Sequence, residues 1–387
     1  MRPLLKKLLL LGVTVLICTL LIELIFRIYW PYTSIYVPDD SLNYKPKPNF
    51  EGVYKSPEGE VKFWTNKEGF VDQDPKTEKA PGTTRIFITG DSFVEGLYNE
   101  RDKHFTTLLQ QKLNSGGTGK YEVVSYGTSS WGTDNEYKYI TTQGLKYNPD
   151  AVVLEYYQND LENVAVSRLF KVDNGKIIPT NVGGTALGNK VKKAITKCSF
   201  YSHFCSYFQI HAAGFGFLHP ILYKLGFSVG QGNASISKAS YKLGPYLKEP
   251  QNHESELALD QAWNKTEMLL QEIKNAVEAK GGKLAIAYVP ARWEVGKEQK
   301  AAFLKQNNLT ENDVNMNAFR NKLVKISERN NIQLIDPTDK FAEAENEGKE
   351  LYQSFVHFTK EGDELFSDAL YEGLESAKFK NAAETKQ

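Results

Sequence analysis

A serine follows an apolar run closely in the stretch Arg85–Leu97, which reads RIFITGDSFVEGL. The β-branched residues from Ile86 to Ile88 predict a buried parallel strand that stops at Gly90-Asp91-Ser92, before a helix-competent segment. A serine at such a strand-to-helix turn stands beside the positive end of the helix, where backbone N–H groups can hold an oxyanion. The pattern therefore suits nucleophilic attack on a carbonyl, although an ordinary Asp/Ser helix cap would look the same.

Three further strand ends carry polar residues that would complete such a site. The second strand is followed by a Ser/Gly-rich loop from Ser125 to Gly132, the third by Tyr157-Gln-Asn-Asp160, and the last by Ser354-Phe-Val-His357. A weak alcohol nucleophile needs a base, usually histidine, and donors for the negative oxygen. Each of these residues alone is explained equally well by a turn or a surface position. Their occurrence at four strand ends favours a single site, because function collects at the carboxyl ends of parallel strands.

Alternating strands and helices predict the scaffold that would position these residues. Such alternation indicates an α/β domain with a parallel sheet and helices on both faces. The expected strands begin at residue 85 and cover 121–125, 151–156, 284–289 and 333–335, and the expected helices cover 104–114, 136–145, 255–280, 319–329 and 359–376.

The blocks Gly90-Asp91-Ser92, Gly127 to Gly132, Asn159-Asp160, and His357 followed by Gly362 resemble the ordered motifs of the SGNH, or GDSL, hydrolase superfamily. The similarity covers roughly residues 66–374, apart from an insertion at about 162–253. It implies a flavodoxin-like three-layer α/β/α domain. It also implies ester hydrolysis or acyl transfer through a serine acyl-enzyme, without a cofactor.

Carried over to this sequence, the resemblance makes Ser92 the nucleophile and its N–H the first oxyanion donor. Asn159 would supply a side-chain donor and His357 the general base. The glycine of the second block falls at Ser130, which leaves only a backbone N–H, and Gly127 or Gly132 would serve if the register shifts. Asp91 is expected to cap the helix or anchor the turn rather than to titrate in catalysis.

Two other positions depart from the family pattern. Tyr157 stands where a glycine usually precedes the asparagine. The acid expected two or three residues before the histidine is absent, since Ser354 and Phe355 stand there. Ser354, a main-chain carbonyl or a remote carboxylate such as Asp336 are the candidates to orient His357.

The N-terminus predicts a membrane anchor. Leu8–Phe26 is nearly all apolar, and about 19 residues at 1.5 Å each span roughly 28 Å, close to a bilayer core. Glu23 can pair with Arg27 one helical turn later. Basic residues before the span predict a cytoplasmic N-terminus and a periplasmic or extracellular catalytic domain. A cleaved signal peptide is the alternative, but no small-x-small cleavage site follows the apolar run.

Composition narrows the remaining choices. A formal net charge of zero over 387 residues argues against a nucleic-acid partner. Outside the anchor, Cys198 and Cys205 either form a disulfide or remain thiols. The other histidines lack metal-ligand spacing, so we expect no metal site. The expected organisation is an anchor (1–32), a stalk and lead-in (33–84), the α/β domain (85–375) and a polar tail (376–387).

These observations predict a membrane-anchored, extracytoplasmic serine ester hydrolase, with an O-acetylated glycan as a substrate suggested by location alone. Two alternatives stay open at this point. The same acyl-enzyme would make the protein an acyltransferase of envelope polysaccharide if a sugar hydroxyl replaced water. The missing acid would also fit a catalytically silent domain that binds glycan or protein on the same scaffold.

Overall fold

The computed structural model describes residues 3–29, 35–39, 41–116, 120–167, 169–180, 242–354 and 356–376. The chain divides into two compact units, one made of residues 1–40 and 181–232 and the other of residues 41–180 and 233–387. Cys198 and Cys205 lie outside the described residues, as does most of the insertion expected at 162–253. The predicted domain boundaries therefore stay predictions.

In the first unit, helix α1 (Pro3–Tyr29) has a mean hydropathy of 2.8 over its most apolar window and no buried residue. It is a candidate membrane span or signal sequence. The Glu23 and Arg27 side chains form the expected ion pair, with 2.6 Å between Oε1 and Nε. This pairing lowers the cost of placing two charges at the exit end of an apolar helix. Strand β1 (Tyr36–Asp39) follows.

The second unit opens with the lead-in, where β2 (Asn43–Pro46) precedes an antiparallel hairpin. Its strands β3 (Glu51–Ser56) and β4 (Gly59–Trp64) pair from Glu51 opposite Trp64 to Ser56 opposite Gly59. Side chains alternate in exposure along β3, as expected for a ribbon with one covered face. The lead-in thus includes a folded element of the same unit as the sheet.

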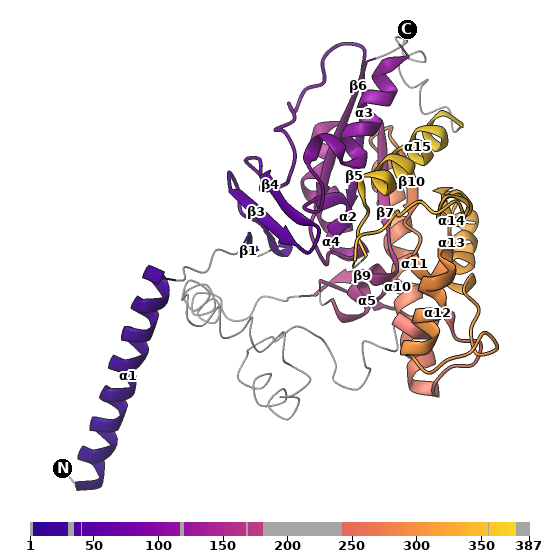
Figure 1. The fold of residues 1–387 in the computed structure, drawn as a ribbon. Helices are drawn as coiled ribbons and strands as arrows, with labels where there is room; N and C mark the ends of the chain where they lie inside the picture. The colour runs from indigo at the N-terminus through magenta and orange to yellow at the C-terminus, as the bar shows by residue number, and fades with distance from the viewer. Residues whose placement is uncertain are drawn as a thin grey trace. The chain divides into compact units, whose positions relative to one another are not determined.

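The core of the second unit is a five-stranded parallel sheet in the order β11-β10-β7-β5-β6 (Figure 1). Read from the other edge, this order is the flavodoxin-like 2-1-3-4-5 arrangement, whose switch point lies beside the first strand. Every residue of β5, the first strand of this sheet, is buried, which agrees with its apolar centre from Ile86 to Ile88. The strands are β5 (Thr83–Gly90), β6 (Lys120–Gly127), β7 (Ala151–Tyr156), β10 (Lys283–Tyr288) and β11 (Gln333–Ile335). The predicted sheet is confirmed.

Helices cover both faces of this sheet (Figure 1). One layer contains α3 (Phe105–Ser115) and α15 (Lys360–Ser376), which pack together through the edge-to-face rings of Phe105 and Phe366. The other contains α4 (Thr133–Thr142), α5 (Gln158–Val166) and α10 (His253–Glu278), which contact one another. The expected α/β/α layering is therefore present.

The long helix α10 shows why the sequence forms these elements. Asn252 caps its first turn by accepting a hydrogen bond from the Ser255 N–H, and its apolar stripe, including Leu270 and Ile273, is fully buried. Gly281, with φ of 79°, follows its end. The remaining elements are α2 (Ser92–Glu95), η1 (Arg101–Lys103), η2 (Gly144–Tyr147), β8 (Phe170–Asp173), β9 (Lys176–Pro179), η5 (Gly244–Tyr246), α11 (Arg292–Val295), α12 (Lys297–Gln306), α13 (Ala318–Arg329) and α14 (Thr338–Asn346).

Candidate active site

Ser92 and His357 meet at the carboxyl end of the sheet although 265 positions separate them in sequence. Ser92 is the first residue of α2, immediately after β5, and His357 lies in the loop before α15. The Nε2 atom of His357 is 2.9 Å from the Oγ atom of Ser92. This distance is that of a hydrogen bond, so an imidazole nitrogen that can accept a proton lies next to the serine hydroxyl.

The imidazole of His357 is enclosed by aromatic rings. The Tyr98 ring stacks on it with 3.4 Å between centroids and 10° between planes, and Phe93 lies 5.1 Å away. Burial lowers the pKa of His357 to about 3, because the apolar surroundings disfavour the charged form. No carboxylate contacts this imidazole among the residues that the structure describes. His357 is therefore neutral at physiological pH and able to accept a proton.

Asp91 connects the nucleophile to Asn159. Its Oδ1 accepts a hydrogen bond from the Phe93 N–H at 2.9 Å, which caps α2, and its Oδ2 accepts one from Asn159 Nδ2 at 2.7 Å. Burial raises the pKa of Asp91, and these two hydrogen bonds oppose that rise. The carboxyl is fully buried. Asp91 thus anchors the turn and orients the Asn159 amide, whose second N–H is left for another acceptor.

The loop between β6 and α4 places Ser130 in a left-handed conformation, with φ of 62°. Glycine favours this region of φ, and Ser130 is the position at which the family glycine was aligned. Gly127 and Gly132 do not have positive φ. Gly127 is needed for a close approach, since a Cβ there would lie 2.5 Å from Val94 Cβ. The backbone therefore favours the alignment at Ser130.

The same loop is held by Glu95, a buried residue of α2. Its Oε2 accepts hydrogen bonds from both the N–H and the hydroxyl of Ser129. The Tyr44 hydroxyl from the lead-in donates to the Ser129 carbonyl at 2.7 Å. No partner for the N–H groups of Ser92 or Ser130 is found within the described parts of the chain. Two backbone donors are thus available, one at the start of α2 and one on a preorganised loop.

Replacing Ser130 with glycine tests this backbone geometry. We expect the variant to keep its reaction with an acylating probe, because only the N–H of residue 130 is used. Removing a Cβ from a left-handed position should raise the free energy of unfolding by up to about 1 kcal/mol. Urea denaturation followed by circular dichroism measures this change. Substitution by valine, which is β-branched, should instead destabilise the protein.

A group of buried carboxyls beneath the site was not predicted from the sequence. Glu155, near the end of β7, accepts a hydrogen bond from the Asp91 N–H at 3.1 Å, and a Cβ at Gly90 would lie 2.3 Å from its Oε2. Burial, and then the neighbouring acids, raise the pKa of Glu155, Glu136 and Asp160 well above the ordinary range. The sequence feature that could have indicated this group is Glu155, the single acid inside the apolar stretch 151–156.

Ser354 and Asp336, the two side chains considered for orienting His357, do not contact it in the described structure. Asp336 forms an ion pair with Arg320 and accepts a hydrogen bond from the Thr338 N–H, so it belongs to the start of α14. The Ser354 N–H donates to Glu58 Oε1 at 2.7 Å, and its hydroxyl contacts the same oxygen. Ser354 is therefore engaged by the β3–β4 hairpin.

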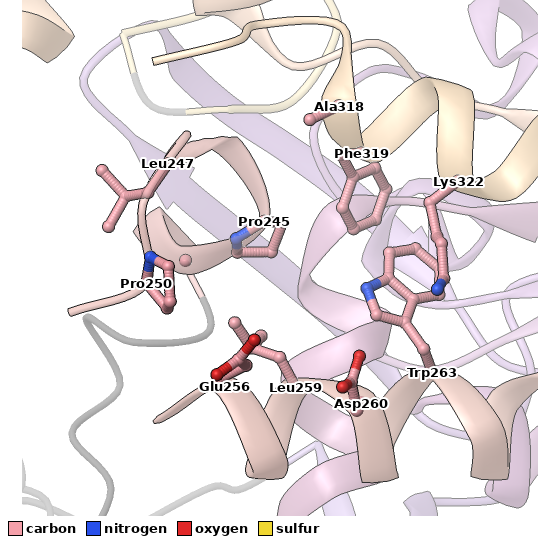
Figure 2. Close-up of a pocket in the computed structure, with 11 residues that line it drawn as sticks. Pro245, Leu247, Pro250, Glu256, Leu259, Asp260, Trp263, Ala318, Phe319 and Lys322 are labelled. Carbon is pink, nitrogen blue, oxygen red and sulfur yellow. The ribbon is translucent and has the colours of Figure 1, made fainter. Parts of the chain in front are cut away.

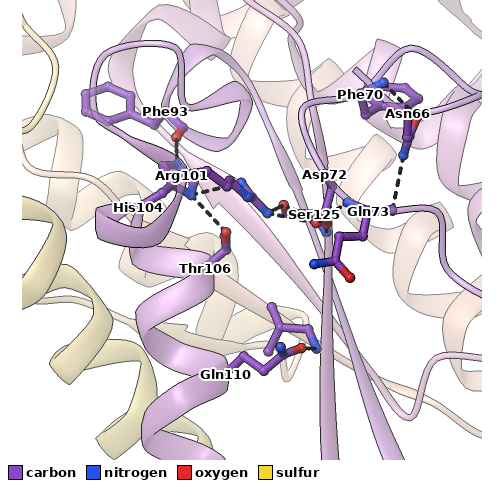
Figure 3. A network of polar contacts seen from close by, with 11 residues as sticks. Asn66, Phe70, Asp72, Gln73, Phe93, Arg101, His104, Thr106, Gln110 and Ser125 are labelled. Carbon is purple, nitrogen blue, oxygen red and sulfur yellow. Dashed lines mark hydrogen bonds and ion pairs between the residues drawn. The ribbon is translucent and has the colours of Figure 1, made fainter. Parts of the chain in front are cut away.

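A polar network beside the site fixes α2 against the lead-in (Figure 3). His104 is buried, with its Nε2 2.8 Å from the Phe93 carbonyl and its Nδ1 2.8 Å from the Thr106 hydroxyl. Arg101 contacts Asp72 at 3.0 Å, and Asp72 accepts a hydrogen bond from the Ser125 N–H. Burial lowers the pKa of His104 to about 3. His104 is thus a buried histidine with a hydrogen-bond partner on each ring nitrogen.

A separate pocket lies between α10, η5 and α13 (Figure 2). Pro245, Leu247, Trp263 and Phe319 line it, with Glu256 and Asp260 on the α10 side. It contains none of the candidate catalytic residues. Across the described ranges, no group of three or more His, Cys, Asp or Glu side chains has an arrangement that could hold a metal ion.

Comparisons with known proteins give structural likenesses only. No family model and no curated protein matches the chain. Similar solved structures include an acetyl xylan esterase (15% identity, TM-score 0.40, 75% of this chain and 99% of that one), TesA (11%, 0.39, 76% and 99%) and a member of the lipolytic protein G-D-S-L family from Veillonella parvula (11%, 0.37, 75% and 97%). At these identities and TM-scores the likeness carries no argument about activity, so the chemistry rests on the side chains described above.

Proposed function

We propose that this chain is a serine ester hydrolase that acts through an acyl-enzyme on Ser92, with His357 as the general base. The observation that carries this proposal is the 2.9 Å contact between Ser92 Oγ and His357 Nε2 at the carboxyl end of the sheet. A neutral imidazole in hydrogen-bond contact with a serine at a helix N-terminus is the arrangement that activates a weak alcohol nucleophile.

The residues account for each transfer in the reaction. Ser92 Oγ attacks the ester carbonyl while its proton moves to His357 Nε2. The N–H groups of Ser92 and Ser130 and the remaining N–H of Asn159 stabilise the oxyanion. His357 then returns the proton to the leaving alcohol. In the second half, water attacks the acyl carbonyl while His357 Nε2 accepts a proton from it. The bond between the acyl carbon and Ser92 Oγ then breaks, His357 returns its proton to Ser92 Oγ, and the carboxylic acid leaves.

The apolar helix α1 supports an extracytoplasmic location. Its 27 residues are long enough to cross a bilayer, and basic residues precede its apolar stretch. A domain exported in this way would meet acylated glycans of the envelope, and we include an O-acetylated glycan in the proposal as the substrate. Acetate release from such a glycan, with and without an added sugar acceptor, separates hydrolysis from acyl transfer.

Labelling with a fluorophosphonate probe tests the nucleophile. The detergent-solubilised full chain should be labelled, and Ser92→Ala should not, because the probe reacts with an activated serine hydroxyl. Ser115→Ala is a control, since it removes an exposed hydroxyl at the end of α3 that donates to the Lys112 carbonyl, and it should leave labelling in place. Labelling of neither the parent nor Ser92→Ala would favour a catalytically silent binding domain, the reading suggested by the absence of a carboxylate against His357.

A further inference from the structure

The loop that carries His357 is a closed turn. The Gln353 N–H donates to the His357 carbonyl at 2.8 Å, and Tyr352 and Phe358 form an antiparallel bridge on either side. The position of the imidazole therefore depends on how Gln353 and Ser354, at the start of this turn, are held. A shift of this turn would move His357 Nε2 relative to Ser92 Oγ.

Two charged side chains hold the turn from different elements. Glu58, in the turn of the β3–β4 hairpin, accepts hydrogen bonds from the N–H and the hydroxyl of Ser354. Arg292, the first residue of α11, donates to the carbonyls of Gln353 at 3.0 Å and Ser354 at 3.2 Å. Hydrogen bonds to charged groups are shorter and stronger than neutral ones. At the start of the turn, Glu58 thus binds hydrogen-bond donors of Ser354, and Arg292 binds the carbonyl acceptors of Gln353 and Ser354.

The same hairpin also supports the ring that stacks on the imidazole. Tyr54 of β3 packs edge-to-face against Tyr98, with 4.8 Å between ring centroids. Tyr98 in turn stacks on His357, and its carbonyl accepts a hydrogen bond from Gln353 Nε2 at 3.1 Å. The hairpin therefore supports His357 through two sets of contacts: Glu58 binds Ser354 in the same turn, and Tyr54 packs against Tyr98, which stacks on the imidazole.

We propose that Glu58 is a positioning residue which, with Arg292, fixes the His357 turn in place of the missing triad acid. This inference rests on the proposed function. In a triad, the acid both orients the imidazole and stabilises its charged form. Here the orientation comes from the clamped turn and the Tyr98 stack.

In this proposal Glu58 holds the turn in position through its hydrogen bonds, and its charge does not act directly on His357. Burial accounts for the low pKa of His357, with no carboxylate raising it. The hydrogen bonds from Ser354 lower the pKa of Glu58 to about 2, so this carboxylate stays ionised across an ordinary assay range. Both contacts use one oxygen, Oε1. An amide at this position can therefore keep both hydrogen bonds without the charge.

The test compares Glu58→Ala and Glu58→Gln with Glu60→Ala in the full chain. Glu60 is the matched control, because it lies on the same hairpin and pairs with Lys55 at 2.6 Å. We expect Glu58→Ala to lower kcat for an aryl acetate, and the rate of phosphonate labelling, by up to about 10²-fold, with little change in KM. Glu58→Gln should recover most of this loss. The thermal midpoint should stay the same in all three, because Glu58 is exposed.

Two outcomes would overturn the inference. Rates for Glu58→Ala equal to those of Glu60→Ala would show that the turn does not need this contact. Equal losses in Glu58→Ala and Glu58→Gln would show that the negative charge acts instead of the hydrogen bonds. Either result is distinct from failure of the proposed function, in which the parent chain is not labelled at Ser92 at all.

Discussion

Replacing His357 with alanine is expected to slow acylation of Ser92 by about 10²–10⁴-fold, the usual contribution of a positioned general base. The imidazole Nε2 lies 2.9 Å from the Ser92 hydroxyl, nearer than the Asp91 carboxylate, whose Oδ1 lies 3.5 Å from it. Stopped-flow phosphonate labelling measures the acylation rate directly. His253→Ala is the control, because His253 is exposed at the start of α10.

The pH dependence of the same rate tests the environment of His357. Its pKa is lowered to about 3, so the imidazole stays in the neutral, proton-accepting form as pH falls from 8 through 6.5. We therefore expect the acylation rate to change little in this range and to decline only toward pH 4 and below. A midpoint near 6.5, the ordinary value for histidine, would contradict the buried aromatic setting.

Acid unfolding must be followed in parallel. A histidine that is buried neutral gains a proton on unfolding once the pH is below its ordinary pKa of about 6.5, so its contribution to the free energy of unfolding falls as the pH drops through that value. His104 is buried in the same way and adds to this effect. Circular dichroism at each pH separates loss of the fold from loss of the base.

The sheet, and the meeting of the candidate site residues at one of its edges, could be predicted because their signals are local. The apolar stretch before Gly90 and the run from Ala151 to Tyr156 each report a buried strand without reference to the rest of the chain. Parallel pairing then brings the strand ends together, which is why Ser92, Asn159 and His357 could be placed at one edge.

The supporting contacts could not be predicted, because they join distant segments without any shared pattern. Glu58 and Ser354 are 296 positions apart, and nothing in the polar turn around Glu58 indicates its partner. The β3–β4 hairpin lies within the segment expected to be a stalk and lead-in, for which no strand was predicted, although its strands pair over six residues. The stacking of Tyr98 on His357 likewise depends on the path of the chain after α2.

The buried acid Glu155 illustrates a different limit. Its neighbours in the sequence are mostly apolar, so the strand was correctly predicted, but periodicity says nothing about a carboxyl that accepts a hydrogen bond from the turn before Ser92. The reason becomes visible only with Gly90, whose missing Cβ leaves room for the Glu155 carboxyl. Sequence patterns predict which face a residue occupies more readily than which atoms it meets.

Replacing Asn159 with alanine is expected to lower kcat by about 10²–10³-fold with a smaller change in KM, as for loss of one oxyanion donor. Asp91 holds one N–H of this amide at 2.7 Å, which leaves the other for the developing negative charge. Steady-state kinetics with an aryl acetate measures both constants. Asn163→Ala is the control, because Asn163 lies one turn later on α5 and donates to the Trp131 carbonyl instead. A matching loss there would show that the effect is structural.

A double-mutant cycle with Asn159 tests whether Asp91 acts by orienting the Asn159 amide. Asp91→Asn keeps an oxygen to accept from the Phe93 N–H but replaces the acceptor that orients the Asn159 amide. Its kcat should fall by less than that of Asn159→Ala, and the double variant should be little worse than Asn159→Ala alone, because both changes remove one interaction. Asn159→Ala also leaves the buried Asp91 Oδ2 without its donor, so the free energy of unfolding should fall by about 1–3 kcal/mol. Additive losses in kcat would instead mean that Asp91 acts on Ser92 directly, through the 3.5 Å contact between the two side chains.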